Sequence, residues 1–278
     1  SGALAARQRL SFLLPYRKVF EAWFENTDTG REIIKISNQM YLEAFVLTLK
    51  SDRIERAFEL LEEWTQGEFW KESELADSVR LEMAKSLGEA LVSLPAEPTV
   101  MGPQPQVNPE ELAIHMVKNE KVLRLFLTSE FSYPWVAVAW QVKDKERLKL
   151  LLSPDKMARV PASIKKDSKL HDDIYQYIVG RGLNEMGEYA RADALLSKVE
   201  SKRLLEKATR QRILSFKGLS DYKTAVKLST GLLPLVDKSE KPSTLLEILD
   251  LAEVGKQWNS APKLLELAKT LKLKDDQL

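Results

Sequence analysis

The sequence predicts an all-α protein. Only 11 of its 278 residues are glycine, while leucine, alanine, glutamate and lysine, which favour helices, are abundant. The Asn-Gly and Asp-Gly pairs that mark tight β-hairpins are absent. Apolar residues recur at helical spacing along most of the chain, so each helix is expected to bury one face.

The C-terminal part of the sequence repeats one short pattern three times. An aromatic residue, Tyr189, Tyr222 or Trp258, is followed three positions later by alanine and then by leucines. The three alanines, which are 33 and 36 residues apart, are Ala192, Ala225 and Ala261. A period in the thirties with helical apolar spacing is typical of stacked helix pairs. The sequence therefore predicts an α-solenoid, a superhelix of stacked antiparallel helix pairs.

The first copy of this pattern resembles a tetratricopeptide repeat (TPR), and the resemblance covers residues 171–278. The matching residues are Tyr175, Val179, Gly180, Leu183, Gly187, Tyr189, Ala192, Leu196 and Val199. The resemblance implies that Gly180 and Ala192 are small because two helices cross closely there. It also implies that Tyr189 fills the wedge between one helix pair and the next. Gly187 suits a residue that leaves a helix in a left-handed conformation.

The other copies depart from the family pattern. Ile213 and Leu249 replace the small glycine of the first helix, and Ser220 and Lys256 replace the glycine of the turn. A weaker copy without glycines occupies residues 52–61. The resemblance is therefore most specific in the first copy.

The first block of the chain is expected to span residues 1–95. Pro15 interrupts its first apolar face. Asp52 and Glu55 have the spacing of a capping box, with Asp52 as the N-cap of a helix. The helices of this block are expected over residues 10–24, 33–49, 52–64 and 73–94.

A proline-rich linker is expected over residues 96–108. Proline fixes φ and lacks an N–H donor, so this segment cannot be helix or inner strand. It is either an exposed tether or an extended strip that lies on the helices. A proline-rich recognition segment for an aromatic groove is the alternative. The four prolines in and beside it are Pro95, Pro98, Pro103 and Pro105.

Helical signals resume after the linker. A middle block over residues 109–170 begins where Asn108 caps a helix that has Pro109 at its first position. The TPR-like repeats occupy residues 171–278, and Pro242 opens their last helix pair.

Composition excludes several classes of function. The 42 basic and 41 acidic residues nearly cancel, whereas nucleic-acid-binding proteins usually carry a basic excess, so no nucleic-acid partner is expected. Cysteine is absent, so no disulfide, thiolate metal site or cysteine nucleophile is possible. A cysteine-free chain favours a bacterial periplasmic location, with the cytoplasm as the alternative. The apolar run 135–140 is much shorter than the roughly 20 residues that span a bilayer, so no membrane insertion is expected.

No catalytic, cofactor-binding or metal-binding motif is present. The two histidines, His115 and His171, belong to no metal-ligand pattern; His115 is expected to be a packed structural residue and His171 a solvated one. Walker loops, G-x-G-x-x-G fingerprints and G-x-S-x-G elbows are all missing. The chain is therefore expected not to be an enzyme and to need no cofactor.

The resemblance implies a non-catalytic scaffold that binds a protein or peptide partner, here in a bacterial envelope or motility-type assembly. The alternative is a superhelical accessory domain of a larger enzyme, such as a cell-wall lytic enzyme. Cationic and amide groups on the first helices would suit an acidic or carboxylate-ended ligand. Trp70, which follows a turn beside Lys71, is a further candidate anchor. The expected partner-binding residues are Tyr175, Gln176, Arg181, Asn184, Arg210, Arg212 and Trp70.

Overall fold

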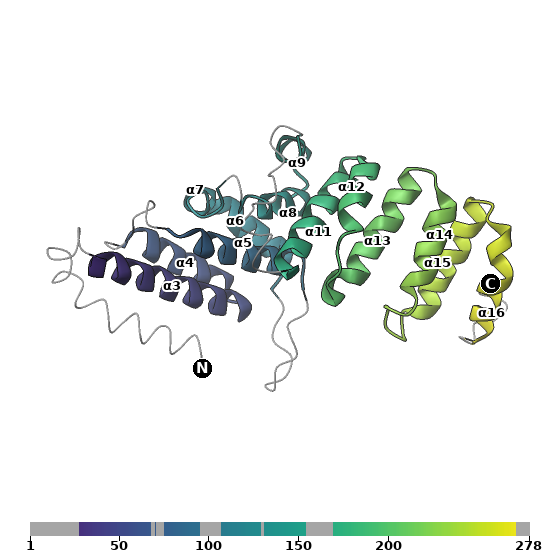
Figure 1. Ribbon diagram of the computed structural model, residues 1–278, viewed down its shortest axis with the longest axis horizontal. Coiled ribbons are helices and arrows are strands. Elements are labelled where there is room, and N and C mark those ends of the chain that lie inside the picture. Colours follow the sequence, from purple (N-terminus) through teal and green to yellow (C-terminus); the bar gives the residue numbers. More distant parts are fainter. Residues whose placement is uncertain are drawn as a thin grey trace. The chain divides into compact units, whose positions relative to one another are not determined.

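The computed structural model describes residues 28–67, 70, 75–94, 107–128, 131–153 and 169–270 (Figure 1). Within these residues the chain contains thirteen α-helices and no strand, which confirms the all-α prediction. The helix expected over residues 10–24 and the proline-rich stretch 95–106 lie outside the described residues. The chain divides into two units, residues 1–167 and residues 168–278.

The helices described in the first unit are α3 (Asp28–Lys50), α4 (Ile54–Thr65), α5 (Asp77–Leu91), α6 (Pro109–Lys118), α7 (Glu120–Leu123), α8 (Pro134–Gln141) and α9 (Lys145–Leu151). Helix α5 packs against α3, α6 and α8. Helices from both sides of the proline-rich segment therefore belong to one unit.

Large aromatic side chains form part of the core of the first unit. Trp64 is almost fully buried, and its Nε1–H donates to Asn38 Oδ1 at 2.9 Å. Its ring centroid lies 4.7 Å from that of Phe126 and 5.7 Å from that of Tyr41. A buried tryptophan whose N–H has a partner combines large apolar burial with a satisfied polar group.

The helices of the second unit are α11 (Lys169–Glu185), α12 (Tyr189–Leu196), α13 (Lys202–Gly218), α14 (Tyr222–Leu232), α15 (Lys241–Val254), the 3-10 helix η4 (Trp258–Ser260) and α16 (Ala261–Thr270). Each α-helix packs against the next one along the chain, and α11 also packs against α13. Figure 1 shows these helices following one another in chain order, from green to yellow.

Five helix pairs in the described residues are joined by the same turn. If n is the last residue of the first helix, residue n + 2 has positive φ, and the N–H of residue n + 3 donates to the carbonyl of residue n − 2. This is the Schellman arrangement, which satisfies carbonyls at a helix end. The left-handed residues in the five turns are Asp52, Lys143, Gly187, Ser220 and Lys256.

These turns test two expectations from the sequence. Gly187 is left-handed with φ 76°, as predicted, and Ser220 and Lys256 adopt the same conformation with φ 59° and 53°. The prediction that Asp52 is an N-cap is wrong. Asp52 is the left-handed residue that ends α3, and Arg53 precedes α4 without a side-chain cap. The turn geometry is therefore set by the backbone hydrogen bonds rather than by glycine.

Two other helix starts agree with the sequence. The Asn108 side chain accepts hydrogen bonds from the backbone N–H groups of Glu110 and Glu111, at 3.0 and 3.4 Å, and Pro109 occupies the first turn of α6. Pro242 lies in the first turn of α15. In both places proline stands where its missing N–H would have had no helical partner.

Gly180 lies where α11 and α12 cross. A Cβ added at Gly180 would be 2.6 Å from Leu196 Cγ and 3.3 Å from the carbonyl oxygen of Ala192. Real Cβ atoms rarely approach other atoms so closely, so any side chain here would push the two helices apart. The prediction that Gly180 and Ala192 are small because of a close crossing is confirmed.

Aromatic residues fill the gap between one helix pair and the next. A Cβ on Gly218, at the end of α13, would overlap the ring of Tyr189, which begins α12. In the same way a Cβ on Gly255, directly after α15, would overlap Tyr222, which begins α14. The wedge expected of Tyr189 is therefore present, and Tyr222 repeats it one helix pair later.

Candidate functional site

A groove opens in the second unit between α13 and α15. Its volume is about 540 Å³. Helix α13 forms one wall, α15 forms the other, and α14 forms the floor with Tyr222, Ser229 and Leu232. Helices α11, α13 and α15 are the first helices of three consecutive pairs. Helices α11 and α13 pack directly against each other. The groove opens where the next two, α13 and α15, are separated.

Exposed apolar side chains border this groove. Leu214 on the α13 wall is 47% exposed, and Val254 on the α15 wall is 65% exposed. Ile213 and Leu251 extend the apolar lining inward. Apolar surface that faces water inside a concavity favours a ligand that covers it, because burial stabilises by about 25 cal/mol per Å².

The two walls carry opposite charge. Helix α13 contains six basic residues and one acidic residue, whereas α15 contains one basic residue and three acidic residues. In the groove lining this contrast appears as Arg210 and Lys217 on one wall and Glu247 and Asp250 on the other. A segment lying in the groove would meet basic groups along one edge and acidic groups along the other.

A basic stripe runs along α13 to the groove. Arg203, Lys207 and Arg210 are spaced four and three residues apart and therefore share a helix face, which Leu214 and Lys217 continue. Burial lowers the pKa of Lys207, and the charge of Arg181 lowers it further against the opposing effect of Glu206. Burial and the nearby Arg181 thus both disfavour the charged form of Lys207.

Two expected partner-binding residues are buried, which corrects the prediction for them. Tyr175 is 3% exposed and Gln176 is 8% exposed. The Gln176 amide donates to Asp172 at 3.1 Å, and burial raises the pKa of the Tyr175 hydroxyl, with a smaller contribution from Asp172. Helix α11 buries nearly every residue between His171 and Gly180, so it has no polar outer face at these positions.

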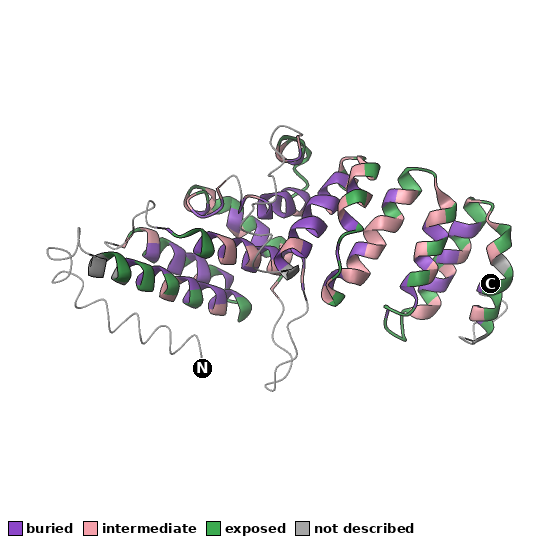
Figure 2. Cartoon of the chain, in the orientation of Figure 1, coloured by how far each residue is buried: buried purple, intermediate pink, exposed green. Residues whose placement is uncertain are grey.

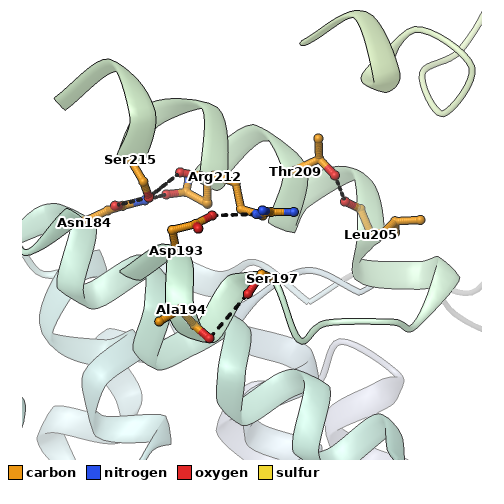
Figure 3. Close-up of polar contacts among 9 residues, drawn as sticks. Asn184, Asp193, Ala194, Ser197, Leu205, Thr209, Arg212 and Ser215 are labelled. Atoms are coloured by element: carbon orange, nitrogen blue, oxygen red, sulfur yellow. Dashed lines mark hydrogen bonds and ion pairs between the residues drawn. The ribbon is translucent and has the colours of Figure 1, made fainter. Parts of the chain in front are cut away.

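Asn184 and Arg212, two other expected residues, hold helices together (Figure 3). The Asn184 side chain donates to the Gln211 carbonyl at 2.8 Å and accepts from the Ser215 hydroxyl at 2.7 Å. Arg212 Nε donates to Asp193 Oδ1 at 2.7 Å. These contacts tie α11 and α12 to α13, so both residues stabilise the stack of helices.

Arg181 and Arg210 remain near the basic stripe. Arg181 is half-buried and bonds the Tyr177 hydroxyl; burial raises the pKa of Tyr177, and the charge and hydrogen bond of Arg181 reduce that increase. Arg210 pairs with Glu206 at 2.9 Å and with Glu240 at 3.0 Å, and it also lines the groove. Of the seven residues expected to bind a partner, Arg210 alone is part of the groove lining.

Trp70 belongs to the first unit and is half-buried rather than exposed. Its ring centroid lies 5.1 Å from that of Phe126 and 5.7 Å from that of Trp64. Trp70 therefore packs against the aromatic core of the first unit.

The described residues also bear on chemistry and on membranes. No three histidine, aspartate or glutamate side chains among them are placed to hold a metal ion. None of the described helices is both long and apolar enough to cross a membrane. His115 stacks on Phe58 at 5.8 Å, as expected of a packed histidine. His171 is 1% exposed, so the expectation that it is solvated is wrong.

We found no match to this chain among protein-family models, curated proteins or solved structures. The candidate site is thus defined by the residues of this chain. Sequence reasoning missed Leu214 and Val254, the exposed apolar residues of the groove. For Leu214 a signal was present, since an apolar residue interrupts the basic stripe between Arg210 and Lys217.

Proposed function

We propose that this chain is a non-catalytic, TPR-like helical-repeat scaffold that binds a segment of a protein partner in the groove between α13 and α15. The observation that carries the proposal is the apolar groove itself, with Leu214 and Val254 exposed on facing walls. The sequential packing of helix pairs and their common turn support a solenoid arrangement of the second unit.

The walls specify the chemistry of the bound segment. Leu214 and Val254 suit an apolar ridge, as presented by one face of an amphipathic segment. Arg210 and Lys217 suit acidic groups beside that ridge, and Glu247 and Asp250 suit basic groups on its other side. The partner is therefore a protein segment with an apolar ridge and oppositely charged edges, bound in one orientation. The absence of cysteine supports an oxidising location such as the bacterial periplasm.

The test compares groove variants with a matched surface variant in affinity capture from native extract. Leu214→Glu and Val254→Glu place a charge in the apolar lining and are expected to reduce recovery of the partner at least about tenfold. Leu219→Glu is the control, because Leu219 is similarly exposed at 46% and does not line the groove. Circular dichroism checks that all variants remain helical.

Recovery of one stoichiometric partner by the parent chain and by Leu219→Glu, but not by the groove variants, would support the proposal. Equal recovery by all variants would refute binding in the groove. A charge exchange then examines orientation: Lys217→Glu is expected to weaken capture, and Asp250→Lys is expected to weaken it independently.

A further inference from the structure

The second unit contains a series of aromatic wedge residues, and the last of them is not packed under a following helix among the described residues. Tyr189 packs over Gly218, and Tyr222 packs over Gly255. Trp258 is the third aromatic of the series, since it directly follows the same turn. Its side chain is 62% exposed. None of the helices in the part of the chain that the structure describes repeats the roles of α13 and α15 at this position.

The helix face that continues from Trp258 is exposed in the same way. Pro262, Leu265 and Lys269 follow at helical spacing, and all three are exposed, with Leu265 at 43%. We call Trp258, Pro262, Leu265 and Lys269 the end face. Figure 2 shows α16 largely green, the colour of exposed residues, whereas α14 and α15 carry several purple, buried stretches.

The equivalent face of α14 shows what the end face lacks. The residues 36 positions earlier are Tyr222, Val226, Ser229 and Leu233. Tyr222 is half-buried and the other three are buried, and Val226 and Leu233 share a hydrophobic cluster with Leu245, Ile248 and Ala252 of α15. Helix α15 thus covers α14 with an apolar stripe that Gly255 follows. The same kind of helix would cover the end face.

We propose that the end face binds a helix of a partner protein, one that carries an apolar stripe and a glycine or alanine over Trp258. The interface would continue the one already formed between α14 and α15. Exposed Trp258 and Leu265 place apolar surface on a helix face whose counterpart on α14 is covered by α15, which indicates a surface suited to being covered.

The chain's own last eight residues are a poor match to this helix. Residues 271–278 contain neither glycine nor alanine, whereas both glycines at the filled wedges lie under an aromatic ring. The site differs from the groove, because neither Trp258 nor Leu265 lines it.

The test supplies a helix of the required kind to the intact chain. Residues 239–256, which include α15 and Gly255, are appended after Leu278 through a flexible linker, so that the added helix is present at high effective concentration. Hydrogen–deuterium exchange of the α16 amides is then measured. We expect about tenfold slower exchange than in the parent chain. Appending the same segment with Gly255→Leu, or using a Trp258→Ala host, is expected to abolish this protection.

Equal protection by the glycine and leucine versions, or no protection by either, would overturn the proposal. Two further measurements examine other occupants. Sedimentation of the parent chain is expected to show a monomer, and a dimer that Leu265→Glu abolishes would assign the end face to a second copy. Removal of residues 271–278 is expected to leave α16 exchange unchanged, and a tenfold acceleration would assign the face to the chain's own tail.

Discussion

The two units use their apolar residues differently. Among the described residues, the largest fully buried side chains are aromatic and belong to the first unit: Trp64, Tyr133, Phe45, Phe126 and Phe131. The second unit instead brings helices together at small residues such as Gly180 and exposes apolar side chains in its groove and on its end face. The difference teaches that the first unit is organised around large aromatic side chains, whereas the second brings its helices together at small residues.

Replacing tryptophan in each unit is the strongest test of this contrast. Trp64→Ala removes a buried indole and leaves the Asn38 amide without its partner, so we expect a loss of about 3–5 kcal/mol in the free energy of unfolding. Trp258→Ala removes a largely exposed side chain and is expected to change stability by less than about 0.5 kcal/mol. Urea denaturation followed by circular dichroism measures both, and similar losses would contradict the contrast.

Two glycines of the second unit distinguish close packing from helix propensity. Gly218→Ala would place a methyl group against the Tyr189 ring, with an expected cost of about 1–3 kcal/mol. Gly231→Ala is the matched control, because a Cβ there meets nothing within 4 Å, and it is expected to stabilise α14 by about 0.5–1 kcal/mol. Thermal and urea unfolding of the two variants should move in opposite directions. If both variants lose stability, the close contact with Tyr189 does not distinguish Gly218 from Gly231.

The left-handed turns give a smaller effect of defined sign. Ser220→Gly and Lys256→Gly relieve a positive φ at a residue with a side chain, and each is expected to stabilise the second unit by about 0.5–1 kcal/mol. The converse change, Gly187→Ala, is expected to destabilise it by about 1 kcal/mol. If the glycine variants lose stability in urea, the backbone strain at these turns is not significant.

An ion-pair cluster in the first unit should make a small, pH-dependent contribution. Burial raises the pKa of Glu120, but hydrogen bonds from Arg124 and the charge of Arg147 outweigh it and lower the pKa below its usual 4.5. The carboxylate therefore stabilises the fold above about pH 4.5, and this stability disappears as the pH falls through the lowered pKa. Glu120→Gln is expected to cost less than about 1 kcal/mol at pH 7.

The cost of the same substitution is expected to shrink as the pH falls below 4.5 and through the lowered pKa, because Glu120 then becomes protonated in the folded state as well. Glu32→Gln serves as a control, since the Glu32–Lys35 pair is more than 60% exposed on both sides and contributes little. A cost of Glu120→Gln that does not shrink as the pH falls below 4.5 would show that its charge is not responsible.

Much of the fold could be predicted because helix signals are local. Asn108 and Pro242 marked helix starts, and the spacing of Tyr189, Gly180 and Ala192 indicated a close helix crossing, because each signal depends on residues near in sequence. Asp52 was misread because a capping box and a Schellman turn both use a polar residue between two helices. The left-handed φ of Asp52 is visible in the backbone alone.

The binding residues were harder to predict because exposure depends on tertiary packing. Tyr175 and Gln176 stand where the family pattern places a ligand-facing surface, yet α11 is buried around them. Arg212 looked available, but Asp193 from another helix neutralises it. Leu214 interrupts a basic stripe, but Val254 resembles an ordinary core residue in sequence, and the separation of α13 and α15 that leaves both exposed has no local sequence signal.

The neighbour-to-neighbour packing of the second unit has a mechanical consequence. Helices α14, α15 and α16 each pack against the helix before them. Tension applied at residue 270 would therefore detach α16 first and then α15, while the packing of α11 stays largely unchanged. Each of these contacts joins helices that are near in sequence, so little chain has to be ordered to form it. This favours rapid refolding of the helices once the tension is released. Under tension the second unit would thus unfold progressively, beginning with α16.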